Sequence, residues 1–206
     1  LVLAEGQTPA DSAQIRIYLY SDDQQASPRV YLLGMTADPL RHEREDATRA
    51  ERMLRLPVYA CLRRDPSIAT RIATPTTLCM LMNRWGEDAL PEEVARAMYD
   101  SGSGSFGNLS FATAIAGAYG YQSYLQYGGI DLLRQQVRRG SAVAAQVKYR
   151  APALGDAEMG TAAVHSAPAL PVLEGAAADS HGHLVAVRGF VRKDGEEWVV
   201  LNDPLN

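Results

Sequence analysis

Apolar residues recur at helical spacing in four stretches of the chain. One apolar face is formed in the first stretch by Leu78, Leu81, Met82 and Trp85. Thr74 is a suitable N-cap for this helix, Pro75 suits its first position, and Gly86 suits its end. The sequence therefore predicts helices over residues 75–85, 91–99, a stretch that follows Asn108, and 130–139.

Alternation of period two indicates strands at both ends of the chain. Two strands are predicted within residues 13–35, joined by a turn at 21–25, and a third is predicted at 142–149. Strands at 183–190 and 197–201 flank Lys193, Asp194 and Gly195, which is a hairpin signal. Residues 151–180 are rich in Ala, Gly and Pro, and we expect a long, exposed and mobile loop there.

This order of elements predicts an α+β fold, with N-terminal helices packed on an antiparallel sheet and a short β-rich segment in front. We divide the chain into a β-rich segment with a linker over residues 1–45 and a main domain over 46–206. Hydrophobic residues make up 47% of the 206 positions, which is enough for a sizeable core.

The charge pattern argues against nucleic acid as a partner. The net charge is −4, and no long run of Lys and Arg is present to contact phosphates. No apolar run reaches the length of a membrane-spanning helix, so we expect no membrane span in this chain.

Two positions attract attention for their chemistry before any resemblance is considered. Ala73 directly precedes a predicted helix, where a cysteine would have its thiolate stabilised by the helix N-terminus. A hairpin centred on Asp194 places residue 183 opposite residue 205, so Asp203 becomes a diagonal neighbour of His183. Such a His–Asp pair can form the orienting half of a catalytic triad, although a surface histidine and a turn aspartate are the plainer interpretation.

Several segments, in the same order, resemble one family. Residues 71–78, Arg-Ile-Ala-Thr-Pro-Thr-Thr-Leu, resemble the nucleophile motif Arg-Ile-Cys-Ser-Pro-Thr-Ser-Leu of bacterial papain-like cysteine peptidases related to the bacteriocin-processing (double-glycine leader) peptidases. Residues 104–108 resemble the family's helix entry and 111–121 its following helix. Residues 182–190 resemble its histidine strand and 202–204 its acid motif. The resemblance covers about residues 54–206 and implies a papain-like fold.

The resemblance assigns His183 as the general base, Asp203 as its orienting acid and Ala73 as the position of the lost nucleophile. Residues 56–61, Leu-Pro-Val-Tyr-Ala-Cys, resemble the stretch Val-Pro-Ala-Tyr-Ser-Gln, whose glutamine supplies an oxyanion-hole donor. Here Cys61 stands in its place, and a thiol is a weak donor. Loss of both groups favours natural decay of the site over a single engineered Cys-to-Ala change.

The leading interpretation is thus a catalytically inactive peptidase-like domain that binds a peptide or protein segment, without a cofactor or metal. The alternatives are an active cysteine peptidase whose nucleophile was replaced at Ala73, or a structural module of a larger exported protein. The resemblance further implies a bacterial protein that is secreted or lies in the cell envelope, although the sequence contains no signal that would confirm this location.

Other candidate residues have plainer explanations. Cys79 lies about 9 Å along the helix from position 73, so a buried core cysteine is expected there. A Cys61–Cys79 disulfide and a metal site at His181 and His183, with His165, are the alternatives that the sequence leaves open. The tyrosines at 119, 121, 124 and 127 are expected to line the core or a groove.

Overall fold

The computed structural model describes residues 14–30, 33, 52–150 and 180–205. The chain divides into two compact units, Leu1–Glu45 and Asp46–Asn206. Each unit is described by itself. The loop predicted at 151–180 lies, apart from Ser180, outside the described residues, and so does His165.

Residues 14–30 contain no strand, so the prediction of the first strand, around Ile15 to Leu19, is wrong, whereas the second predicted strand, at 30–33, lies partly outside the described residues. Ile15, Ile17 and Leu19 alternate as in a strand, yet all three are about half exposed. Alternation alone does not make a strand, because a strand needs a neighbour that completes its ladder of hydrogen bonds. The turn predicted between them is present, with the Ala26 N–H donating to the Asp23 carbonyl at 3.3 Å.

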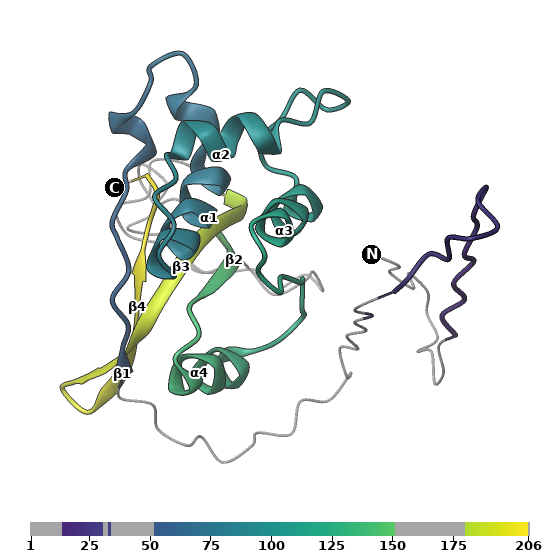
Figure 1. Ribbon diagram of the computed structural model, residues 1–206. Coiled ribbons are helices and arrows are strands. Elements are labelled where there is room, and N and C mark those ends of the chain that lie inside the picture. Colours follow the sequence, from purple (N-terminus) through teal and green to yellow (C-terminus); the bar gives the residue numbers. More distant parts are fainter. Residues whose placement is uncertain (1–13, 31–32, 34–51, 151–179, 206) are drawn as a thin grey trace, which may run out of the picture. The chain divides into compact units, whose positions relative to one another are not determined.

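The second unit contains four α-helices, two 3₁₀ turns and four strands among its described residues (Figure 1). In chain order these are β1 (Arg52–Met53), η1 (Cys61–Arg63), η2 (Ala69–Arg71), α1 (Ala73–Arg84), α2 (Pro91–Met98), α3 (Leu109–Ala118), α4 (Ile130–Arg139), β2 (Val143–Tyr149), β3 (Ser180–Lys193) and β4 (Glu196–Asn202). The predicted α+β class and antiparallel sheet are confirmed.

β3 is the central strand of the sheet. Its residue Phe190 pairs with Arg52 of β1 and with Val199 of β4, so β1 and β4 lie on opposite sides of it. β2 pairs with β3 on the side of β1, and every pairing is antiparallel. Gly189 allows the close approach of β1, because a Cβ at this position would collide with the backbone oxygen of Arg52.

A bulge in β3 sets the register of the C-terminal hairpin. The two turn residues, Asp194 and Gly195, have φ angles of 54° and 84°, as a type I′ turn requires. Near this turn Phe190 pairs with Val199, but the register shifts between Val187 and Gly189. The extra residue in β3 changes which part of β4 lies beside the histidine end of β3.

The helix α1 packs between the sheet and the other helices. Its Met80 contacts a core cluster of buried residues that includes Val187 and Phe190 of β3. Its Cys79 and Met82 contact a second cluster with residues of α2 and α3. The hydrophobic face predicted for this helix is therefore present except at Trp85, which lies just beyond the last turn and is 58% exposed.

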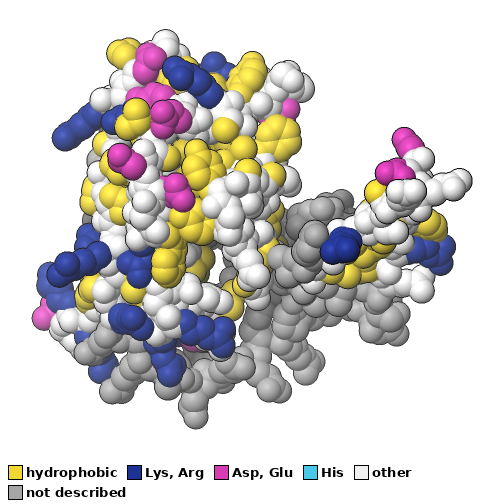
Figure 2. All heavy atoms as spheres, viewed as in Figure 1, with side chains coloured by type: hydrophobic (Ala, Val, Ile, Leu, Met, Phe, Trp, Pro, Cys, Tyr) yellow, Lys and Arg dark blue, Asp and Glu magenta, His cyan; other side chains and the backbone are white. Residues whose placement is uncertain are grey.

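Charged side chains are unevenly distributed over the second unit. On the face shown in Figure 2, Lys and Arg side chains gather toward the end where α4 and the β3–β4 turn lie, while at the other end acidic side chains lie among further Lys and Arg side chains. The last turn of α4 contributes Arg138 and Arg139 to this basic end. Within the described ranges, no helix has the length and apolar character needed to cross a membrane.

Candidate active site

Helix α1 begins at Ala73, two residues earlier than predicted. Ile72 is its N-cap residue and provides no side-chain cap, so Thr74 lies inside the helix instead of capping it. Pro75 is the third helical residue, a position that still needs no N–H partner because the first four amides of a helix are free. The Thr76 side chain donates to the Ile72 carbonyl at 2.7 Å and stabilises this first turn.

The start of α1 is attached to β3 through a residue one turn after Ala73. Thr77, one turn further along, is buried and donates a hydrogen bond from Oγ1 to the backbone oxygen of Leu184 at 2.9 Å. Residues four apart share a helix face, so Ala73 belongs to the same face as Thr77. Leu184 directly follows His183, and this contact therefore fixes the start of α1 beside the histidine segment of β3.

His183 and Asp203 form a direct contact, and their predicted proximity is confirmed. His183 Nε2 lies 2.8 Å from Asp203 Oδ1, and the histidine side chain is only 8% exposed. Beyond the β3 bulge, Ala186 pairs with Asn202, and this register brings Asp203 next to His183. When Asp203 is ionised it accepts the Nε2–H, which leaves the lone pair of the neutral imidazole on Nδ1.

Asp203 is held as a carboxylate. Burial of the group opposes ionisation, but the hydrogen bonds from His183 and from the Leu205 N–H outweigh this effect, so the pKa of Asp203 lies below its usual value. A fixed negative charge at this point favours the Nε2–H tautomer of the imidazole.

Two neighbouring side chains support the pair and were not predicted. Tyr149 at the end of β2 contacts the His183 ring edge-on, with the ring centroids 6.2 Å apart. Asn202 is buried and donates to the Pro57 carbonyl at 3.0 Å, which fixes the residue before Asp203. The pairing of Val147 with His183 could have suggested Tyr149, but only once the register of β2 was known.

Cys61 lies close to the acid residue but is enclosed. Its backbone N–H donates to the Pro204 carbonyl at 2.7 Å, and its side chain is fully buried in a cluster with Ile72 and Phe106. Ala73 and Leu205 pack against the same cluster. Burial, and to a smaller extent the charge of Asp203, raises the pKa of the Cys61 thiol, so this residue is a poor nucleophile.

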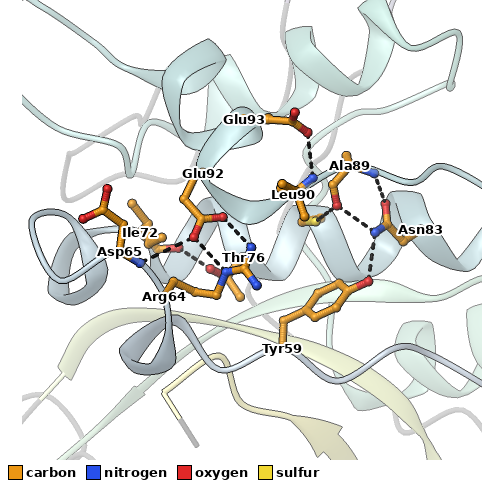
Figure 3. A network of polar contacts seen from close by, with 11 residues as sticks. Tyr59, Arg64, Asp65, Ile72, Thr76, Asn83, Ala89, Leu90, Glu92 and Glu93 are labelled. Carbon is orange, nitrogen blue, oxygen red and sulfur yellow. Dashed lines mark hydrogen bonds and ion pairs between the residues drawn. The ribbon is translucent and has the colours of Figure 1, made fainter.

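Cys79 is a core residue, as predicted. It is completely buried, its thiol donates to the Ala89 carbonyl at 3.1 Å, and burial raises its pKa to about 12. Asn83 bonds the same carbonyl at 2.9 Å and also contacts the Tyr59 hydroxyl at 3.0 Å (Figure 3). Both cysteines are free thiols in the structure.

The same view shows how the segment between Cys61 and α1 is attached to α2 (Figure 3). The Arg64 guanidinium donates to both carboxylate oxygens of Glu92, with Nε and Nη2 at 2.8 and 2.6 Å. Glu92 stands in the first turn of α2, where the helix dipole also favours a negative charge. The Arg64 hydrogen bond lowers the pKa of Glu92 below its usual value. This bidentate pair therefore holds the segment that leads to Ala73.

Three of the four tyrosines lie outside the core, so the core part of their prediction holds for Tyr121 alone, and their place in a groove stays a prediction. Tyr119, Tyr124 and Tyr127 are 43%, 56% and 60% exposed, and only Tyr121 packs against a core cluster. The connector after α3 contains no helix or strand in which an apolar face could form, so these rings have no layer to pack into. In the described part of the chain, no group of three or more His, Cys, Asp and Glu residues could hold a metal ion.

Comparison with known proteins finds a family match. The model of the Peptidase_C39 like family matches residues 63–206, which is more than half of the chain. Neither the curated proteins nor the solved structures contain a significant match. The matched range contains Ala73, His183 and Asp203, but begins two residues after Cys61.

Proposed function

The chain belongs to the Peptidase_C39 like family, and we propose that its second unit is a cysteine-peptidase-related domain that no longer hydrolyses peptides and instead binds a peptide or protein segment. The observation that carries this proposal is the His183–Asp203 contact of 2.8 Å beside a helix that begins with alanine. The base and its orienting acid remain, while the methyl group of Ala73 cannot attack a carbonyl.

Loss of the nucleophile removes the covalent route of a cysteine peptidase. In that route a thiolate forms a bond to the carbonyl carbon of the peptide, and the imidazolium then donates its proton to the leaving amine. At position 73 no atom can form the first bond. The two buried cysteines do not replace it, because their thiols are enclosed and their pKa values are raised.

Binding uses the groups that remain. The Nδ1 atom of His183 can accept a hydrogen bond from a peptide N–H when the ring is neutral and can donate to a carbonyl or carboxylate when it is protonated. A bound segment would stay intact because the covalent step is missing. By resemblance to exported relatives, we place this binding outside the cytoplasm, in the cell envelope or beyond it.

The proposal is tested with a random peptide library offered to the native chain, His183→Ala and the control Lys193→Ala. Bound peptides are measured by fluorescence anisotropy, and cleavage is measured by mass spectrometry. We expect binding without cleavage in the native chain, about tenfold weaker binding in His183→Ala for the loss of one hydrogen bond, and unchanged binding in Lys193→Ala. Cysteine-dependent cleavage by the native chain would overturn the loss of hydrolysis, and absence of any bound peptide would overturn the binding function.

A further inference from the structure

The outer edge of β4 has backbone groups that no described residue pairs. Lys193 and Glu196 close the two-residue turn, so the backbone N–H and C=O groups of Glu196, Trp198 and Val200 point toward β3. Those of Glu197, Val199 and Leu201 must then point outward. No backbone hydrogen bond from another described residue reaches these three, and no described strand pairs with this edge.

The side chains of this edge are apolar and exposed. Trp198, Val199 and Leu201 are 53%, 37% and 41% exposed. Natural proteins protect a sheet edge with proline, lysine or a bulge. β4 contains no proline or lysine, and the hairpin bulge lies on β3. Glu196 and Glu197 are the charges of the strand, and Glu197 is already bonded to Arg134 of α4 at 2.7 Å.

The order of residues along β4 suits a second copy of the same chain. A two-fold axis at Val199 pairs this residue with its own copy and places Glu197 opposite Leu201 of the other chain. Trp198 then lies beside Val200 of the other chain on the opposite face. Because the acidic end of each strand meets the neutral end of the other, no carboxylate faces another carboxylate. A parallel arrangement would bring the acidic ends together.

We propose that β4 is a self-association edge, through which two copies of the chain join antiparallel about Val199 into one continuous sheet. Two-fold pairing through one self-complementary surface is the commonest way in which proteins form dimers. A seven-residue strand covers much less than the roughly 800 Å² per partner of a stable interface. The dimer is therefore weak and forms only at high protein concentration.

The first test removes one outward N–H group. In Val199→Pro this donor is lost, while the pairing of β4 with β3 remains because proline is tolerated where the N–H points away from the sheet. The matched control Val199→Thr keeps the N–H and the branched side chain. Sedimentation velocity from about 10 μM to 1 mM should show concentration-dependent dimers for the native chain and Val199→Thr, and a monomer for Val199→Pro. A native chain that stays monomeric throughout this range would overturn the proposal.

The second test checks the register and does not depend on proline. Leu201→Glu places a carboxylate opposite Glu197 of the other chain, whereas Leu201→Lys places an ammonium group there. We expect dimerisation to weaken at least threefold in Leu201→Glu and to be maintained or strengthened in Leu201→Lys, with the difference decreasing in high salt. Equal dimerisation of the two variants would contradict the pairing about Val199. The finding that two copies associate only when an unrelated peptide is bound at the edge of β4 would contradict it as well.

Discussion

At the scale of single residues, the position of a thiol decides whether it can act. Cys61 and Cys79 are both fully buried, and their environments raise the pKa of each thiol. Position 73 differs from both, because it is the first residue of a helix and is only partly buried. Of these three positions, 73 is therefore the least enclosed, and it carries a methyl group.

Both native cysteines should resist alkylation. We expect iodoacetamide at pH 8 to leave Cys61 and Cys79 unmodified in the folded protein, because only the thiolate reacts and both side chains are enclosed. The same reagent in concentrated urea should modify both. Intact-mass measurement over several hours distinguishes the two states, and rapid modification of Cys79 under native conditions would contradict the pKa of about 12.

Asp203 should contribute pH-dependent stability. The pKa of Asp203 is lower in the folded state than in the unfolded state. Its contribution to the free energy of unfolding is therefore complete when the pH is above the unfolded-state pKa of about 3.9, and it is lost as the pH falls through the lower folded-state pKa. Asp203→Asn keeps the acceptor for His183 but cannot titrate. Urea unfolding from pH 3 to 7 should show the native chain more stable than Asp203→Asn above about pH 5, with the difference shrinking toward pH 3. A constant difference over this range would show that Asp203 is not a perturbed carboxylate.

The sequence identified the residues of the pair better than it identified their surroundings. The turn signal placed His183 and Asp203 on neighbouring strands, and the β3 bulge, which the sequence did not reveal, completes the register that joins them. Tyr149 was missed, because its contact with the His183 ring depends on a strand pairing that is distant in the sequence. Trp85 was expected on the buried face of its helix but is exposed, because burial just after a helix end depends on neighbours that are also distant in the sequence.

At the scale of elements, the C-terminal hairpin sets the distance between His183 and Asp203. Its turn needs two successive residues with positive φ. Its bulge, which lies between the turn and His183, shifts the pairing of β3 with β4 by one residue. A turn of another type would rotate β4 relative to β3 and separate the two side chains.

Gly195→Ala should therefore destabilise the protein. An alanine at φ of 84° costs about 1 kcal/mol, and the melting temperature should fall by roughly 2–4 °C. Asp194→Asn is the matched control, because asparagine is favoured at the first position of this turn and should leave the melting temperature unchanged. An equal melting temperature for Gly195→Ala and the native chain would show that the turn has another geometry.

The Arg64–Glu92 pair should hold the segment before α1. Arg64→Ala breaks a bidentate contact whose side chains are 28% and 18% exposed, and we expect a loss of about 1.5 kcal/mol in the free energy of unfolding. The control Arg63→Ala removes a neighbouring exposed arginine and should change the free energy of unfolding by less than about 0.5 kcal/mol. Chemical denaturation measures both, and equal effects would mean that the contact does not fasten this segment.

Elements with several agreeing signals were predicted well. The fourth helix has Gly140 beyond its end in a left-handed conformation, and its predicted and observed bounds agree. The start of α1 was predicted two residues late, because a threonine and a proline resemble a cap even where the helix already began. The strand predicted around Ile15 to Leu19 is absent because alternation was its main signal, and a strand depends on a partner strand for its hydrogen bonds.

At the scale of the molecule, the candidate site joins parts of the chain that are distant in the sequence. The start of α1, the early part of β3 and the residue after β4 meet through the Thr77–Leu184 and His183–Asp203 hydrogen bonds. Such long-range contacts cannot be derived from local periodicity. The order of the motifs supplied this information, and the family match over residues 63–206 supports the relationship that it implied.

The central claim is that position 73 is the former nucleophile position beside the His183 imidazole. The most direct test is the pH dependence of iodoacetamide alkylation in Ala73→Cys, measured by mass spectrometry with and without His183→Ala. Ala97→Cys, at an exposed position in α2, is the control for an ordinary helical thiol. The account predicts that the thiol at 73 titrates at least about one pH unit below the control, and that His183→Ala moves it back toward the usual value of about 8.5. A profile for Ala73→Cys that coincides with that of Ala97→Cys, and does not respond to His183→Ala, would contradict it.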